Sequence, residues 1–230
     1  MNINGLQKLT LLDFPGKTAC TVFLAGCDMR CPFCHNSELI DGTAEVIMDE
    51  KDLLKFLNTR QGLLDGVAFT GGEPLMRKDL PELMREIKKL GYTIKLDTNG
   101  QHPDALKPLI EEHLIDYIAM DVKNSPEKYP ETSGFVNVNL DKIKESINII
   151  MNSGVDYEFR TTVVNELHDE SSFEGIGKLI SGASKYFLQA FIDRDSVAFS
   201  GFTSPSKEQL EKYASIAMKY VQNVEIRGVS

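Results

Sequence analysis

The chain has 230 residues, 42% hydrophobic and 26% charged, which is typical of a globular protein long enough to bury a sizeable core. Its formal net charge of −9 argues against nonspecific binding to nucleic acid or to an anionic membrane, because both need a basic surface. No apolar run approaches membrane-spanning length, and residues 1–10 lack the basic and apolar parts of a signal peptide. We therefore expect a cytoplasmic protein that binds neither nucleic acid nor membrane, with a single domain over residues 1–230.

The predicted elements alternate between strands and helices from one end of the chain to the other. Residues 5–17 begin as an extended segment and end at a Pro-Gly turn, and the apolar run 18–25 is typical of a strand buried on both faces. Further strands are predicted at 66–70, 92–96, 115–120, 157–164, 186–192 and 224–227. Helices are predicted at about 49–57 with Asp49 as its N-cap, 80–90, 103–112, 140–152, 171–180 and 207–220. Residues 124–137 are predicted to form a polar loop.

This alternation predicts βα units and a parallel sheet with right-handed crossovers. About six such units are fewer than the eight of a closed barrel. We therefore predict an α/β fold that is a partial, open barrel of the TIM type, about (βα)6, with outer helices. Polar motifs at 27–35, 71–74, 97–100 and 121–123 each follow a predicted strand. Because the C-terminal ends of parallel strands meet at one face, we expect these motifs to share one mouth.

Three of the four cysteines lie in the loop 26–36 with the spacing C-x3-C-x2-C: Cys27, Cys31 and Cys34. Clustered thiolates are soft ligands that suit an iron–sulfur cluster or zinc, and disulfides are rare in the cytosol. A cubane cluster has four irons, so three protein thiolates would leave one iron open to a small molecule. The alternative is a structural zinc site with His35 as fourth ligand, although no second cysteine pair follows. Cys20, inside the first apolar run, is expected to be a small buried hydrophobe.

The C-x3-C-x-aromatic-C motif resembles the signature of radical S-adenosylmethionine (SAM) enzymes, and Thr70-Gly71-Gly72-Glu73-Pro74 resembles the second signature of that family. The resemblance implies a radical SAM fold and one [4Fe–4S] cluster on Cys27, Cys31 and Cys34. It also implies that SAM binds the open iron through its amino and carboxylate groups. Phe33 would lie beside the adenine, and Cys34 and His35 would flank the cofactor. Gly71, Gly72 and Glu73 would bind the methionine amino group.

Two later motifs help to distinguish between groups of enzymes within this family: Asp97-Thr98-Asn99-Gly100 and Asp121-Val122-Lys123. Taken alone, they are polar residues at strand ends, which helix capping or solvation would explain equally well. Together they resemble the D-T-N-G and D-x-K signatures of the small activases that install glycyl radicals in partner enzymes. The resemblance implies that Lys123 pairs with the SAM carboxylate. It also places Asp97, Asn99 and Asp121 at SAM, and implies that Asp97, Thr98 and Asp121 can hold a monovalent cation.

Four further segments resemble most the activating proteins of anaerobic ribonucleoside-triphosphate reductase: residues 9–27, 31–36, 159–164 and 224–229. The resemblance implies that the reduced cluster cleaves SAM to methionine and a 5′-deoxyadenosyl radical, which takes a hydrogen atom from a glycine of that reductase. Flavodoxin or ferredoxin would supply the electron. The chain lacks the cysteines of a ferredoxin-like insert, so one cluster is expected. No catalytic residue is expected beyond the cluster and SAM.

Two other functions stay open at this stage. The first is a radical SAM enzyme that acts on a small molecule, like the 7-carboxy-7-deazaguanine synthases, with residues 124–138 or 192–204 lining its pocket. Only Lys128 and Arg194 supply basic groups in those segments, which favours the activase. The second is a non-enzymatic zinc or cluster-binding module. Of the remaining histidines, His102 and His113 are expected at the surface, whereas His168 follows a strand and could reach the mouth.

Overall fold

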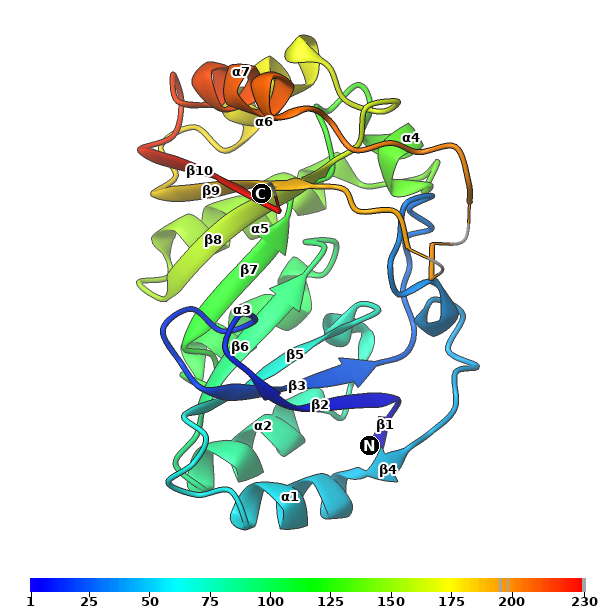
Figure 1. The fold of residues 1–230 in the computed structure, drawn as a ribbon. Coiled ribbons are helices and arrows are strands. Elements are labelled where there is room, and N and C mark those ends of the chain that lie inside the picture. The colour runs from blue at the N-terminus through cyan, green and yellow to red at the C-terminus, as the bar shows by residue number, and fades with distance from the viewer. Residues whose placement is uncertain (195, 198, 229–230) are drawn as a thin grey trace.

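The computed structural model describes residues 1–194, 196–197 and 199–228, and its centre is a curved eight-stranded sheet (Figure 1). The strands follow the order β10-β9-β8-β7-β6-β5-β3-β2 across the sheet. Their bounds are Gly5–Thr10 for β2, Ala19–Leu24 for β3, Gly66–Gly71 for β5, Thr93–Thr98 for β6, Tyr117–Asp121 for β7, Asp156–Val163 for β8, Lys185–Ala190 for β9 and Asn223–Arg227 for β10. A small separate pair is formed by β1 (Asn2–Ile3) and β4 (Met48–Asp49).

Apart from α4, which lies beside the loop that follows β3, the helices lie along the outer face of this sheet (Figure 1). Their bounds are Glu50–Asn58 for α1, Leu80–Lys89 for α2, Pro103–Glu111 for α3, Tyr129–Ser133 for α4, Leu140–Asn152 for α5, Glu170–Leu179 for α6 and Lys207–Ala217 for α7. Two short 3-10 helices cover Ser37–Leu39 and Pro74–Met76. The contacts pair α1 with α2, α3 with α5, and α6 with α7. None of the helices in the described part of the chain is both long and apolar enough to cross a membrane.

The predicted fold class is confirmed. Seven strands from β3 to β10 run parallel, and the intervening helices make six βα units before the last strand. Among the described residues the sheet does not close on itself, because β2 and β10 are its two edges. The departure from the parallel sheet is β2, which pairs antiparallel with β3. The physical reason is the short connection 11–18, because a parallel neighbour would need a crossover of a dozen or more residues.

The prediction of a polar loop over residues 124–137 is wrong in part, because this segment contains the short helix α4. Pro130 stands in the first turn of α4, where a missing N–H costs little. Gly134 caps its C-terminus with a left-handed φ of 59°. Elsewhere the predicted helix ends agree with the observed ones to within one residue, except that α7 ends at Ala217 and not at residue 220 as predicted. The carboxylate of Asp49, for example, accepts a 2.9 Å hydrogen bond from the backbone N–H of Asp52 at the start of α1.

The two-residue alternation of the strands separates an apolar outer face from a polar inner face. On β6, Ile94 and Leu96 belong to the core beneath the helices, whereas Lys95 and Asp97 alternate with them and face the other side. The same alternation on β8 sends Arg160 to the inner face. The curved sheet therefore encloses a space lined by charged and hydroxyl side chains. This space holds the candidate site.

Candidate active site

The four polar motifs meet at the C-terminal ends of β3, β5, β6 and β7, where they surround a cavity of about 230 Å³. Its lining contains all of the residues for which we predicted a role: Cys27, Cys31, Phe33, Cys34, His35, Gly71, Gly72, Glu73, Asp97, Thr98, Asn99, Asp121 and Lys123. The shared mouth expected from the strand ends is therefore present. The chemical roles of the individual residues stay predictions.

Backbone hydrogen bonds hold the cysteine loop between two other segments. On one side, the N–H of Cys27 donates to the carbonyl of Ile40 at 2.9 Å. On the other side, the N–H of Arg30 donates to the carbonyl of Ser133, at the end of α4, also at 2.9 Å. The next residue, Gly134, packs so closely that a Cβ there would lie 2.0 Å from the carbonyl oxygen of Arg30. Helix α4 therefore supports the cysteine loop from outside, a role that sequence analysis missed.

The Gly-Gly turn after β5 packs against the start of the cysteine loop. The N–H of Gly72 donates to the carbonyl of Leu24 at 2.7 Å, and the N–H of Glu73 donates to that of Gly26 at 2.7 Å. A Cβ on Gly72 would lie 2.2 Å from the carbonyl oxygen of Gly26, so only glycine fits there. The glycine thus allows two backbones to approach, and this contact fixes the turn relative to the three cysteines.

Glu73 joins the ends of β5 and β6. Its side chain is only 1% exposed, and its carboxylate accepts hydrogen bonds from the Asn99 N–H at 2.6 Å and from the Thr98 hydroxyl at 3.0 Å. The N–H of Leu75 adds a third, at 3.1 Å. Burial raises the pKa of Glu73 to about 7, although these hydrogen bonds oppose the shift. The carboxylate that we predicted for the SAM ammonium group therefore also holds the D-T-N-G turn in place.

Asn99 links this turn to the cysteine loop through Asp28. Its amide donates to one carboxylate oxygen of Asp28 at 2.7 Å, and the other oxygen lies 3.0 Å from Nε2 of His102. Burial raises the pKa of Asp28, but the hydrogen bonds from His102 and Asn99 outweigh it and lower that pKa. The hydrogen bond with Asp28 in turn raises the pKa of His102. We expected His102 at the surface; instead it is partly buried against the loop, and only its position two residues after the D-T-N-G motif pointed there.

Five side chains of alternating charge, here called the charge chain, line the inner face below the mouth. They follow the order Lys95, Asp97, Arg160, Asp121 and Lys123. Arg160 bridges the two carboxylates, with 3.3 Å to Asp97 and 2.9 Å to Asp121. Lys123 lies 3.0 Å from Asp121, and Lys95 contacts Asp97. Sequence analysis did not single out Lys95 or Arg160, although a charged residue within a buried strand is itself a signal.

Neighbouring opposite charges favour the ionised forms of Asp97, Asp121 and Lys123. Burial alone would raise the pKa of Asp97, but the positive charges of Arg160 and Lys95 lower it below the usual range. Arg160 and Lys123 likewise lower the pKa of Asp121. Burial lowers the pKa of Lys123, and the neighbouring carboxylate of Asp121 more than reverses this shift. With three basic and two acidic side chains, the charge chain has an excess of one positive charge beside the cavity.

Burial favours the protonated form of the three cysteine side chains beside the cavity. Burial raises the pKa of Cys27 to about 12, and it also raises the pKa values of Cys31 and Cys34. Thiolates are the ligand form, so bound iron would have to supply the positive charge that stabilises them. Among the described residues, no three His, Cys, Asp or Glu side chains are placed to hold a single metal ion. A cubane cluster differs because it binds each thiolate at its own iron. The donor set at this end of the cavity fits such a cluster.

Aromatic residues and the segment after β9 cover the other side of the cysteine loop. Phe33 is buried against Val164 and Phe191. Nε2 of His35 lies 2.6 Å from the carbonyl oxygen of Ile192, and its ring stacks on Phe191 at 5.4 Å. Figure 1 shows this segment passing beside the cysteine loop. Phe33 therefore gives the cavity a flat apolar side, against which an aromatic base could pack.

The other cysteine and the remaining candidate histidine lie outside the cavity lining. Cys20 is fully buried in the apolar core, where burial raises the pKa of its thiol to about 12. His168 is also buried, and its Nε2 lies 2.9 Å from the carbonyl oxygen of Lys123. Burial lowers its pKa, so the ring is neutral at pH 7. His168 therefore supports the D-x-K motif from behind.

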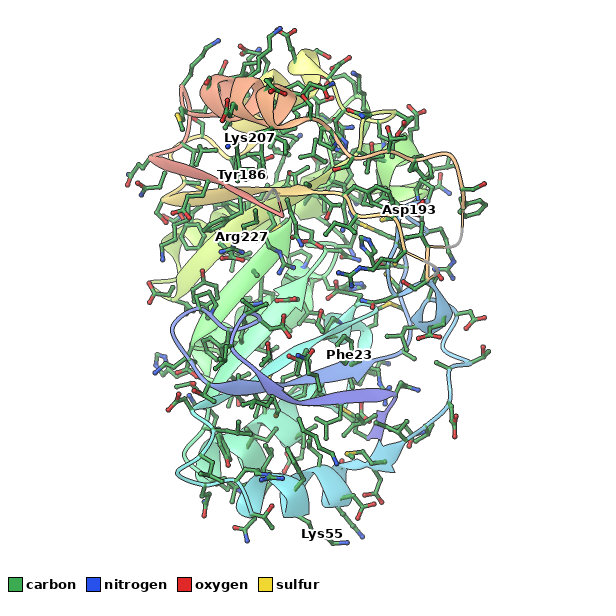
Figure 2. All side chains as sticks on the ribbon, viewed as in Figure 1. Phe23, Lys55, Tyr186, Asp193, Lys207 and Arg227 are labelled. Atoms are coloured by element: carbon green, nitrogen blue, oxygen red, sulfur yellow. The ribbon has the colours of Figure 1, made fainter. Side chains whose placement is uncertain are left out.

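A second cavity of about 310 Å³ adjoins the first on the inner face of the sheet. Both cavities share the lining residues His35, Asn36, Thr70, Asp97, Thr162 and Gln189. The second cavity continues along Asp13 and Thr21 on one side and Arg194 on the other. Figure 2 labels Phe23 on β3 and Asp193 on the segment after β9, the two elements that flank it. The space beside the predicted SAM site is therefore polar and long enough to extend beyond it.

The sequence is similar to those of a known protein family. The sequence profile of the radical SAM superfamily matches residues 21–174. A protein of Methanocaldococcus jannaschii, provisionally named a glycyl-radical enzyme activating enzyme, is 34% identical over 99% of this chain and 96% of its own length. The pyruvate formate-lyase 1-activating enzyme of Escherichia coli is 27% identical over 96% of this chain and 97% of its own. Among solved structures, Streptococcus suis SuiB bound to S-adenosylmethionine is similar in fold. It has a TM-score of 0.69 and 13% identity, and the match covers 90% of this chain and 52% of SuiB.

Proposed function

This chain belongs to the radical SAM superfamily and, within it, to the glycyl-radical-enzyme activating enzymes, and on that premise we propose that it activates anaerobic ribonucleoside-triphosphate reductase. Enzymes of this family use a [4Fe–4S] cluster and SAM. The observation that carries the proposal is the full-length likeness to activating enzymes, since the match leaves almost none of this chain uncovered. The choice of reductase rests on the segments 9–27 and 159–164, which resemble its activating proteins.

We propose that Cys27, Cys31 and Cys34 hold the cluster and that the cavity beside them holds SAM. When bound and reduced, the cluster would supply one electron for the cleavage of SAM, and the resulting 5′-deoxyadenosyl radical would take a hydrogen atom from the partner's glycine. The protein's own contribution is orientation and exclusion of water. Support comes from the three partly buried thiols at one end of the cavity and the apolar ring of Phe33 along its side.

The amino-acid end of SAM would lie between the Gly-Gly-Glu turn and the charge chain. We assign its carboxylate to Lys123, because the charge chain has one positive charge in excess and Lys123 lines the cavity. We assign the ammonium group of SAM to the turn at Glu73. Asn99 connects this turn to the cysteine loop, because it donates hydrogen bonds to both Glu73 and Asp28. This arrangement needs no further acid or base, since the reaction moves an electron and a hydrogen atom.

The small-molecule alternative is less well supported. A small-molecule pocket could use two basic residues, Lys128 and Arg194. Lys128 pairs with Asp169 at 2.6 Å and is not part of the cavity lining. The segment around α4 packs on the cysteine loop. Arg194 does line the second cavity, but a single cation beside Asp13 and Gln189 makes a polar surface suited equally to a peptide segment. Since relatives that match over almost their full length are activating enzymes, we prefer a polypeptide substrate.

The test is anaerobic incubation of the reconstituted protein with SAM, a reductant and purified anaerobic ribonucleoside-triphosphate reductase. We expect the doublet signal of a glycyl radical in the electron paramagnetic resonance spectrum of the reductase. Pyruvate formate-lyase serves as the comparison partner, and a doublet on it alone would overturn the choice of partner. Flavodoxin and ferredoxin, tested in place of the chemical reductant, would identify the electron donor expected in the cytoplasm.

The same assay tests the cluster ligands. We expect Cys27→Ala, Cys31→Ala and Cys34→Ala each to lose iron and sulfide and to form no radical. Cys20→Ala is the matched control, because Cys20 lies in the apolar core and should leave the cluster intact. Equal loss of the cluster in the control would mean that the ligands are misassigned.

A further inference from the structure

The two carboxylates of the charge chain already have positive partners on all four of their oxygens. Lys95 contacts Oδ1 of Asp97, and Arg160 lies 3.3 Å from its Oδ2. On Asp121, Oδ1 accepts from Arg160 at 2.9 Å and Oδ2 accepts from Lys123 at 3.0 Å. Sheet register explains the bridge, because Asp121 and Arg160 are direct neighbours across β7 and β8.

These carboxylates are the ones that the resemblance to activases implied for a monovalent cation, and the residues present do not fit one. A cation bound to both carboxylates would lie against the guanidinium of Arg160, which repels it. The third expected ligand, the hydroxyl of Thr98, donates to Glu73 at 3.0 Å and accepts from the N–H of Gly100 at 3.1 Å. The Thr98 side chain is therefore engaged with the Gly-Gly-Glu turn.

We propose that Lys95, together with Arg160, is a built-in cation that takes the place of the metal ion, so that this enzyme binds SAM without a monovalent cation. Lys95 is only 2% exposed and stands two residues before Asp97 on the inner face of β6. It does not line the cavity, so it acts through Asp97 as a positioning residue. Its charge gives the charge chain its excess of one positive charge, which matches the single negative charge of a carboxylate. The inference rests on the SAM site proposed above.

The first experiment needs no variant. The affinity of the cluster-loaded protein for SAM is measured by anaerobic equilibrium dialysis in choline chloride, potassium chloride and sodium chloride at one ionic strength. We expect dissociation constants that agree within about twofold, since choline is too large to enter a site between two carboxylates. Binding that is tenfold or more weaker in choline would overturn the proposal. No partner enzyme is present, so this result is independent of whether a glycyl radical forms.

The second experiment removes the built-in charge. We expect Lys95→Met to bind SAM at least tenfold more weakly in choline chloride and to recover most of that loss in potassium or sodium chloride. Lys95→Arg should stay independent of the salt. Lys89→Met is the matched control, because it removes an exposed ammonium group that pairs with Glu86. Equal SAM affinity of Lys95→Met in all three salts would refute the role of Lys95.

Thermal unfolding of the cofactor-free protein distinguishes cation binding from a general loss of structure in the variant. The midpoint of thermal unfolding of the cofactor-free Lys95→Met protein should rise in potassium or sodium chloride relative to choline chloride, because the cation can then bind Oδ1 of Asp97 on the side away from Arg160. The wild type and Lys89→Met should show no such difference. A salt effect of the same size in the wild type would count against the proposal. If Lys95→Met does not fold, the wild type and Lys95→Arg decide the question by the dialysis measurement.

Discussion

Replacing Gly134 by alanine should loosen the cysteine loop from a distance. Gly134 ends α4 with a φ of 59°, and a left-handed conformation costs a residue with a Cβ about 1–2 kcal/mol. The new Cβ would also lie 2.0 Å from the carbonyl oxygen of Arg30, beside Cys31. Relieving such an overlap in a packed region typically costs a further ~1–3 kcal/mol. Because the neighbour is backbone of the loop itself, relief must move α4 away from the cysteines.

The matched control is Gly154→Ala, which has a similar φ of 74° but nothing within 4 Å of the new Cβ. Urea unfolding of the cofactor-free proteins should show a loss of about 1–2 kcal/mol for Gly154→Ala and a clearly larger loss for Gly134→Ala. Iron and sulfide analysis after reconstitution should show a full cluster in the control and a reduced cluster content in Gly134→Ala. Equal cluster content in the two variants would refute the view that α4 supports the loop.

Three further predictions concern single side chains. Lys123→Ala should keep the cluster but weaken SAM binding, measured by equilibrium dialysis; unchanged affinity would exclude Lys123 from the site. His102→Gln should destabilise the protein at pH 6 but hardly at pH 9. The hydrogen bond with Asp28 raises the pKa of His102 in the folded state, so its stabilisation is present below the unfolded value of about 6.5 and is lost as pH rises through the folded value. Urea unfolding at the two pH values checks this, and an effect independent of pH would contradict it. Tyr129→Phe should leave the stability of the cofactor-free protein unchanged or higher, because the buried hydroxyl of Tyr129 has no hydrogen-bond partner among the described residues. Tyr186→Phe, which loses a 2.7 Å hydrogen bond, should cost about 1 kcal/mol, and equal losses in the two variants would contradict this reasoning.

The elements that sequence analysis predicted well are those whose signals are local. Helix α5 is observed over the predicted residues 140–152, because its apolar spacing and the Asn139 cap lie within one segment. The strands β3 and β5 are short apolar runs bounded by turn residues, and both were predicted to within one residue at each end. Helix α4 was missed because five residues are too few to show a helical period.

The site residues that were missed depend on neighbours far away in the chain. Arg160 has its role because register places it opposite Asp121 and near Asp97, which lie 39 and 63 positions earlier. Asp28 and His102 meet across 74 positions. No spacing rule along the sequence connects such pairs, since their distance is set by the order of strands in the sheet. A charged residue inside an apolar strand signals only that a partner exists.

By itself, the sequence determined the α/β class, the open arrangement of about six βα units and the motifs that belong to one mouth. Those properties follow from hydrophobic period, turn residues and cysteine spacing, which act over a few residues. Only the tertiary structure decided that α4 supports the cysteine loop, that Gly72 meets the backbone of Gly26, and that Lys95 and Arg160 neutralise the two carboxylates. The physical reason is that packing and charge compensation depend on through-space distance, and the curvature of the sheet brings together strands that the chain keeps far apart.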